Sequence, residues 1–171
     1  MPYDGRWLRF TEDDNYVYLS SDDLTSCYYA REWLSGGGFE GDNQPIFNFK
    51  AGKNNPNPYR LKYRQQAIRQ FAIELAQLNL GNTYITTVPS SKTRDDPDYD
   101  DRMDKMIEIF LSINTNIEYI TPLQCRCSRP PLHLSTSRLT PPLIKANIEW
   151  CEGTYTRYPS IVLIDDVLTT G

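Results

Sequence analysis

Apolar residues recur at helical spacing in three stretches of the chain. Residues 63–78 and 103–113 each carry an apolar residue every three or four positions, and Gly81 supplies a stop after the first stretch. This spacing predicts two helices that each turn one face toward a core. A third helix is predicted over residues 140–150, because prolines are tolerated in a first turn, where backbone N–H groups have no helical partner. We expect Gly153 to close this third helix.

Runs of β-branched and apolar residues alternate with these helices. Residues 83–88 end at Pro89 and residues 117–120 form a shorter run, so both are predicted strands. Residues 160–164 are almost continuously apolar, which is typical of a strand that is covered on both faces and lies in the middle of a sheet. The alternation predicts an α/β fold in which helices flank a mostly parallel sheet and ligands bind beyond the carboxyl ends of the strands.

The first 60 residues lack this regularity. Short aromatic runs of strand-like character occur at residues 16–19 and 46–49. A glycine joint lies at residues 36–38, and a turn-rich segment at residues 54–58. We interpret residues 1–60 as an irregular, hood-like lead-in and residues 61–171 as the α/β core of one domain.

The composition is that of a folded protein whose anion sites must be built locally. Hydrophobic residues make up 39% of the chain, charged residues 23%, and the net charge is −4. Attraction of the whole molecule to nucleic acid or to an anionic membrane is therefore not expected. No apolar run approaches the roughly 20 residues of a membrane span, and the N-terminus lacks a basic-then-apolar signal pattern, so we expect a cytoplasmic location.

The cysteines and the single histidine do not form a recognisable metal motif. Cys27, Cys125, Cys127 and Cys151 lack the C-x-x-C spacing of a structural zinc site, and we interpret them as reduced, partly buried thiols. His133, set among prolines and leucines, is interpreted as structural.

A basic stretch interleaved with tyrosines offers a nucleic-acid surface as an alternative function. Its members are Lys50, Lys53, Arg60, Lys62, Arg64 and Arg69, with Tyr59 and Tyr63 between them. Phosphate contacts and base stacking would suit these residue types. The acidic net charge favours a solvated helix face instead.

The most informative loop follows the last apolar run. Asp165 and Asp166 come directly after it, and Thr169-Thr170-Gly171 comes shortly afterwards. Adjacent carboxylates can accept hydrogen bonds from ribose hydroxyls or hold Mg²⁺ through water. Hydroxyls and successive backbone N–H groups of a small-residue turn can wrap a phosphate. A solvated acidic turn after a core strand is the alternative.

Residues 162–171, Val-Leu-Ile-Asp-Asp-Val-Leu-Thr-Thr-Gly, resemble the signature with which type I phosphoribosyltransferases bind 5-phosphoribosyl-1-pyrophosphate (PRPP). The resemblance implies ribose contacts and water-mediated Mg²⁺ binding by the acid pair, and a 5-phosphate site at residues 168–171. The implied PRPP-binding residues are Asp165, Asp166, Val167, Leu168, Thr169, Thr170 and Gly171. The family signature continues into another small residue and a helix, so we expect this sequence, which stops at Gly171, to be a fragment or a truncated form.

A second polar loop, Pro89-Ser90-Ser91-Lys92, follows the strand predicted at residues 83–88. If the strands are parallel, this loop lies at the same sheet edge as the acid pair. Small hydroxyl residues and a lysine suit a pyrophosphate, and the resemblance implies that Ser90, Ser91 and Lys92 bind the leaving pyrophosphate. An ordinary polar turn is the alternative.

The charged segment at residues 93–102 resembles the mobile loop that closes over the site in type I enzymes. Closure would exclude water from a reactive intermediate, and Arg94 or Arg102 could then reach the pyrophosphate. Helix-capping acids and a solvated face explain these charges equally well.

Over residues 45–171 the order of segments resembles the competence-protein F (ComF) branch of the superfamily. The resemblance implies Mg²⁺-dependent transfer of a phosphoribosyl group from PRPP to a nucleobase-like nitrogen acceptor, with release of pyrophosphate. Asp165, Asp166, Arg94 and Arg102 are the implied catalytic residues. The alternative is a catalytically silent PRPP-binding or regulatory protein in competence, DNA processing or phage defence. No membrane partner is expected, and a homodimer is left open.

Overall fold

The structure is a computed structural model, and it describes residues 8–9, 28–30, 38, 41, 43–129, 141–151, 153 and 155–166. These residues form two compact units, which are separated in the sequence between Leu78 and Asn79. No helix within the described ranges is long and apolar enough to cross a membrane. The division of the chain at residue 60 stays a prediction.

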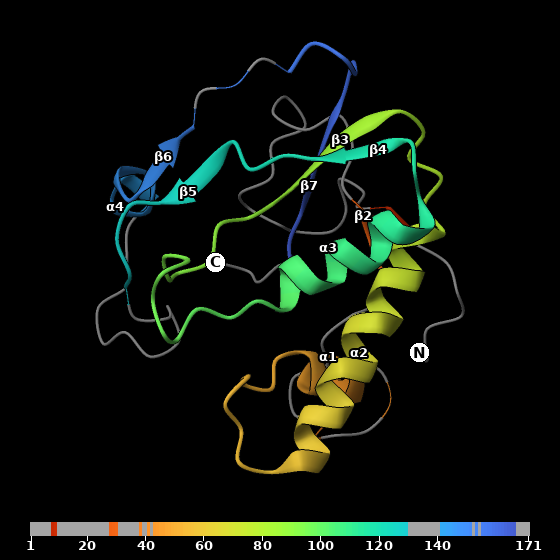
Figure 1. Ribbon diagram of the computed structural model, residues 1–171, viewed down its shortest axis with the longest axis vertical. Coiled ribbons are helices and arrows are strands. Elements are labelled where there is room, and N and C mark those ends of the chain that lie inside the picture. Colours follow the sequence, from red (N-terminus) through yellow and green to blue (C-terminus); the bar gives the residue numbers. More distant parts are fainter. Residues whose placement is uncertain are drawn as a thin grey trace. The chain divides into compact units, whose positions relative to one another are not determined.

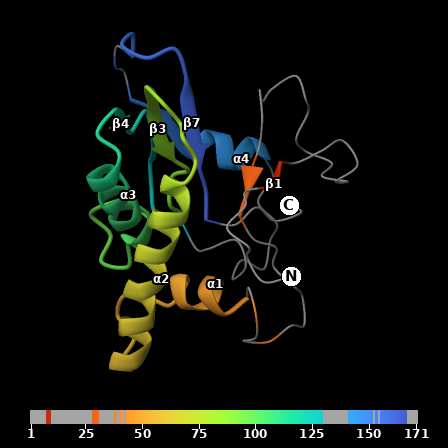
Figure 2. The same ribbon diagram turned by 90° about the vertical axis from the view of Figure 1, so that its right-hand side faces the viewer.

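Two helices and a short strand pair make up the described part of the first unit. The antiparallel pair and the helices are β1 (Leu8–Arg9), β2 (Tyr28–Tyr29), α1 (Asn43–Phe49) and α2 (Pro58–Ala76). Helix α1 lies across α2 (Figure 2). The rings of Phe49 and Phe71 meet edge to face with centroids 5.0 Å apart, so an aromatic contact joins the two helices.

The aromatic run at residues 46–49 is helical, and its interpretation as strand-like is wrong. It belongs to α1, in which Ile46 and Phe49 are both buried. A helix brings positions three apart to one face, and such a short run has no periodicity that could separate helix from strand. Packing against α2 settles the conformation.

Helix α2 begins at Pro58, ahead of the predicted start at residue 63. Asn57 caps the helix, because its Oδ1 accepts a hydrogen bond of 2.9 Å from the N–H of Tyr59. The predicted apolar face is confirmed, since its buried side chains include Ala67, Ile68, Ala72 and Leu75.

The basic stretch divides between two sides of α2. Lys62 and Arg69 are exposed, as expected for a solvated face. Arg64 is only 3% exposed, so the interpretation is wrong for this residue. Arg64 lies three and four positions before Ala67 and Ile68, which puts it on the buried face of the helix.

A parallel sheet of three strands forms the core of the second unit. Strand β3 (Thr83–Thr87) lies between β4 (Ile117–Tyr119) and β7 (Ile161–Ile164), and both neighbours run parallel to it (Figure 1). Helix α3 (Arg102–Ile113) lies between β3 and β4 in the chain, as the crossover that a parallel pair requires. The predicted strands and their parallel arrangement are confirmed.

The central strand is β3, whereas the sequence predicted this place for the run at residues 160–164. Ile85 is 0% exposed, while Ile161 and Leu163 on β7 are 49% and 54% exposed. Within the described residues, β7 pairs with β3 alone, and its exposed side chains alternate, so one face of β7 is open to solvent. The prediction that β7 is covered on both faces is wrong.

Buried polar and aromatic contacts attach the start of β3 to the segment before β7. Thr83 is fully buried, and its Oγ1 donates to the carbonyl of Ser160 over 2.9 Å. The hydroxyl of Tyr84 accepts a 2.9 Å hydrogen bond from the N–H of Arg157, and its ring contacts Tyr158 with centroids 5.0 Å apart. These contacts supplement the backbone pairing of β3 with β7.

Helix α3 confirms the helix predicted over residues 103–113. Met106, Ile107 and Phe110 are buried on one face, and Lys105 and Glu108 are exposed. The apolar spacing was therefore sufficient to locate both the helix and its buried side.

The third predicted helix is shorter than expected. Helix α4 (Pro141–Ala146) is followed by β6 (Ile148–Trp150), which pairs antiparallel with β5 (Leu123–Cys125). The prediction that the helix continues to residue 150 and closes at Gly153 is wrong. β-branched and aromatic residues suit a strand, and pairing with β5 overrides the helical spacing.

The buried position of β3 predicts a large cost for truncating Ile85. Ile85→Ala should lower the free energy of sheet opening by about 2–5 kcal/mol, because the side chain is 0% exposed. The matched change Ile161→Ala removes the same atoms from a side chain that is 49% exposed, and should cost less than about 1 kcal/mol. Native-state hydrogen exchange of the β3 amides measures both changes, and equal costs would contradict the central place of β3.

Candidate functional site

Two predicted site loops begin side by side at one edge of the parallel sheet. Thr87 is the register partner of Ile164 at the carboxyl ends of β3 and β7. The N–H of Val88 donates to the carbonyl of Ile164 over 3.0 Å, which continues the ladder by one more residue. The acid pair and the loop that starts at Pro89 therefore leave the sheet together, as expected from parallel strands.

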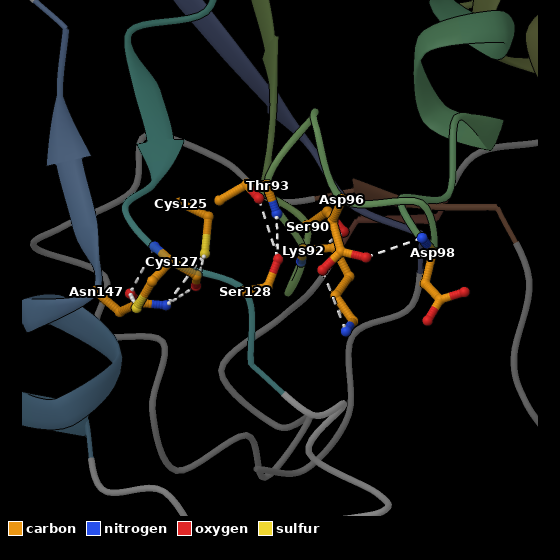
Figure 3. Close-up of polar contacts among 9 residues, drawn as sticks. All are labelled: Ser90, Lys92, Thr93, Asp96, Asp98, Cys125, Cys127, Ser128 and Asn147. Atoms are coloured by element: carbon orange, nitrogen blue, oxygen red, sulfur yellow. Dashed lines mark hydrogen bonds and ion pairs between the residues drawn. The ribbon is translucent and has the colours of Figure 1, made fainter.

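The loop after β3 is folded on itself by short-range hydrogen bonds (Figure 3). The N–H of Lys92 donates to Ser90 Oγ over 3.2 Å, and the N–H of Asp98 donates to Asp96 Oδ1 over 2.8 Å. The carbonyl of Ser91 accepts a 2.8 Å hydrogen bond from the N–H of Arg129. The three residues predicted to bind pyrophosphate thus belong to one ordered turn that is tied to the segment after β5.

Lys92, the predicted point charge for pyrophosphate, is paired with Asp96. Its Nζ lies 3.4 Å from Asp96 Oδ2. The pKa of Asp96 is lowered, first by a hydrogen bond from the Ser128 hydroxyl, then by the N–H of Asp98, with a smaller contribution from Lys92. The Thr93 and Ser128 hydroxyls lie 3.1 Å apart, and the N–H of Thr93 donates to Ser128 Oγ, also over 3.1 Å.

Arg102 connects the segment after β3 with the acid pair. Its Nη2 lies 2.5 Å from Asp166 Oδ2, and its Nη1 lies 3.0 Å from Asp100 Oδ2. All three side chains are largely shielded, with exposed fractions of 21%, 16% and 27% for Arg102, Asp166 and Asp100. The structure thus brings together two predicted catalytic residues, Arg102 and Asp166, from segments that are 64 positions apart.

Arg94 belongs to a different network, centred on Asp104 of α3. Arg94 Nη2 lies 2.9 Å from Asp104 Oδ1, and the Tyr99 hydroxyl donates to Asp104 Oδ2 over 2.8 Å. The Tyr119 hydroxyl lies 3.4 Å from Asp104 Oδ1 and 3.1 Å from Thr87 Oγ1. Arg94 is therefore directed to the first turn of α3, and the predicted contact of Arg94 with pyrophosphate stays a prediction.

Burial and the Asp104 charge perturb both tyrosines of this network. Burial is the largest cause of the raised pKa of Tyr99, followed by its hydrogen bond to Asp104. Burial also raises the pKa of Tyr119; the hydrogen bond with Thr87 acts in the opposite direction, and the Asp104 charge adds to the rise. Both phenols are held in their neutral form beside a carboxylate.

Sequence reasoning missed Asp104, Tyr119 and Ser128 as members of this region. Asp104 was visible only as an acid in the first turn of a helix, a common helix-dipole arrangement. Tyr119 ends a short strand, and Ser128 reaches the loop after β3 from a segment 35 positions later. The parallel pairing of β3 with β4 places Tyr119 beside Thr87, and Ser128 meets Thr93 from the segment after β5.

The acid pair is compatible with a magnesium ion that arrives with a phosphorylated ligand. Within the described residues, no three His, Cys, Asp or Glu side chains gather into a group that could hold a metal. Mg²⁺ commonly uses only one or two protein carboxylates and completes its shell with water and phosphate oxygens. Asp165 and Asp166 supply two adjacent carboxylates of this kind, although Asp166 is already paired with Arg102.

Several predicted residues lie outside the described ranges. They are Val167, Leu168, Thr169, Thr170 and Gly171, together with Cys27 and His133.

Comparisons of the chain with protein-family models, with curated proteins and with solved structures found no match. The likeness to type I phosphoribosyltransferases and to their ComF branch thus stays a prediction from the sequence.

The Asp104 network predicts a late ionisation of Tyr99. An exposed tyrosine has a pKa of about 10, and burial raises the pKa of Tyr99 above this value. Because the folded pKa exceeds the unfolded one, the stability supplied by the neutral phenol is complete below about pH 10 and is lost as the pH rises further. A difference titration of tyrosinate absorbance, wild type minus Tyr99→Phe, should show a component above pH 10.

The substitution Asp104→Asn separates the two causes of the raised Tyr99 pKa, which are burial and the hydrogen bond to Asp104. It should lower the pKa of Tyr99 only in part, since burial, the larger cause, remains. A full return to the pKa of an exposed tyrosine would contradict burial as the main cause.

Proposed function

We propose that the protein binds PRPP with Mg²⁺ at the edge shared by β3 and β7, and transfers the phosphoribosyl group to a nucleobase-like nitrogen acceptor. One observation carries this proposal: because β3 and β7 are paired in parallel, the acid pair and the Ser90-Ser91-Lys92 loop leave the sheet next to each other. In PRPP the pyrophosphate is attached to C1 of the ribose and the free hydroxyls to C2 and C3, so the sites for the two must adjoin. Pyrophosphate is the leaving group.

Each part of the site has a distinct chemical task. Asp165 and Asp166 accept hydrogen bonds from the ribose hydroxyls and fix the sugar. Ser90 and Ser91 offer hydroxyls and backbone amides to the pyrophosphate, and Lys92 neutralises the charge that develops on it. Mg²⁺, when bound, adds further neutralisation of that charge. No side chain needs to act as a covalent nucleophile.

Ligand binding requires that ion pairs be exchanged. Lys92 is paired with Asp96, and Arg102 is paired with Asp166 and Asp100. A pyrophosphate carries more negative charge than one carboxylate and accepts several charge-assisted hydrogen bonds, so both cations can pass from carboxylate to ligand. Release by Arg102 frees the Asp166 oxygen for a ribose hydroxyl.

Isothermal titration calorimetry of PRPP with Mg²⁺ tests the site. Asp165→Asn/Asp166→Asn should weaken binding by roughly 100-fold or more, because each charge-assisted hydrogen bond contributes about 1.5–3 kcal/mol. Glu108→Gln/Glu118→Gln changes the net charge equally at two exposed acids of α3 and β4, and should leave the affinity unchanged. No binding by the wild-type chain contradicts the proposal, and equal losses in both variants would point to net charge alone.

A second candidate is a protein that binds PRPP without turnover. The same ion pairs favour it, because every predicted pyrophosphate ligand with a positive charge already has a carboxylate partner: Lys92 with Asp96, Arg94 with Asp104 and Arg102 with Asp166. A ligand that exchanges these pairs would change the loop after β3, which is the behaviour of a sensor.

Pyrophosphate release separates the two candidates. With PRPP, Mg²⁺ and a panel of purine and pyrimidine bases, an enzyme should release pyrophosphate only when its acceptor is present, and Asp165→Asn/Asp166→Asn should abolish the release. Binding by calorimetry without release for any base would favour the sensor. Release that survives the double substitution would contradict the assignment of the acid pair.

A further inference from the structure

Two cysteine thiols flank one asparagine side chain at the base of the β5–β6 pair (Figure 3). Asn147 Nδ2 donates to Cys125 Sγ over 3.1 Å, and Cys127 Sγ donates to Asn147 Oδ1 over 2.9 Å. The backbone N–H of Cys127 also donates to Oδ1, over 3.2 Å. One carboxamide therefore contacts both sulfur atoms, and both cysteines are free thiols.

The backbone permits a bond between these two sulfurs. Strand β5 ends at Cys125, and the chain bends at Arg126 and Cys127. Two residues of extended strand span roughly 6.6 Å, and a bend shortens this distance. Disulfides usually join Cα atoms about 4.4–6.8 Å apart, and the span expected for Cys125 and Cys127 falls in this range.

The surroundings favour thiol exchange at Cys127. Cys127 is exposed and Cys125 is partly exposed. A small molecule can therefore reach the Cys127 sulfur, and the Cys125 thiol is available for the second step. The thiolate is the attacking species in exchange, so access of the small molecule to the Cys127 sulfur is the first requirement.

We propose that Cys125 and Cys127 form a reversible disulfide by exchange with a small-molecule disulfide of the glutathione class. The Cys127 thiolate attacks the small disulfide, forms a mixed disulfide and expels one thiolate. The Cys125 thiolate then attacks the Cys127 sulfur, closes the protein disulfide and expels the second thiolate. The two protons of the protein thiols end on the two released thiols, so one small disulfide is reduced as one protein disulfide forms.

Asn147 acts in this device as the partner of the reduced state. Its carboxamide donates to one sulfur and accepts from the other, and the second of these contacts needs the S–H hydrogen of Cys127. Oxidation removes that hydrogen, so the contact is lost with the reduced dithiol. The carboxamide therefore shifts the equilibrium toward the two thiols.

Redox titration of the intact protein in glutathione buffers tests the proposal. After acid quench and alkylation, trypsin cleaves at Arg126, between the two cysteines, so a disulfide leaves two peptides linked that separate on reduction. We expect this linked pair in the wild type and, with the same midpoint, in Cys27→Ser/Cys151→Ser, which retains only the proposed pair. Cys127→Ser should not give it.

Other products would overturn the proposal. Full alkylation of both cysteines across all glutathione ratios, a reaction that stops at the mixed disulfide, or linkage of Cys125 to Cys151 each contradict it. Asn147→Ala should shift the equilibrium severalfold toward the disulfide, because both thiols lose their contacts with the carboxamide. An unchanged or opposite shift would contradict the role given to the carboxamide.

Discussion

The parallel pairing of β3 with β7 is the interaction on which the arrangement of the candidate site depends. Four register pairs, from Tyr84 with Ile161 to Thr87 with Ile164, align the carboxyl ends of two strands. This alignment starts the acid pair and the Ser90-Ser91-Lys92 loop at one edge. A shift of a single residue in the pairing would turn the side chains of β7 to opposite faces and separate the two loops.

The cations at this edge of the sheet are held by carboxylates, in a chain whose net charge is −4. The cations at positions 92, 94 and 102 each contact an aspartate, and the pairs range from well exposed to largely shielded. The exposed Arg94 pair costs little to break, because solvent screens its attraction, whereas the shielded Arg102 pair needs a partner of stronger charge to replace its carboxylate. Each of these cations can thus be passed from a carboxylate to a polyanion.

The sequence allowed the elements of the second unit to be predicted where a periodic pattern was long enough. Helix α3 and strand β3 were located from apolar spacing and from a β-branched run, and the shared edge followed from the parallel strands. Strand β6, with three residues, and helix α1, with seven, were not predicted. Such short segments carry too little periodicity, and tertiary packing decides their conformation. Asp104 and Asn147 are defined by partners distant in the sequence, such as Tyr119 and Cys125, which no local pattern encodes.

The separation of the paired strands along the chain has a consequence for how the site assembles. Thr83 and Ser160, which meet at the start of the β3–β7 ladder, are 77 positions apart, whereas β5 and β6 join positions about 25 apart. Closing a longer loop costs more chain entropy, and such non-local pairings form slowly. The hairpin-like β5–β6 pair can form early, but the acid pair reaches Arg102 only when β7 docks. Strand β7 pairs with β3 alone among the described residues and is partly exposed, so β7 is the segment most readily released again. The candidate site is therefore assembled late in folding and lost early in local opening.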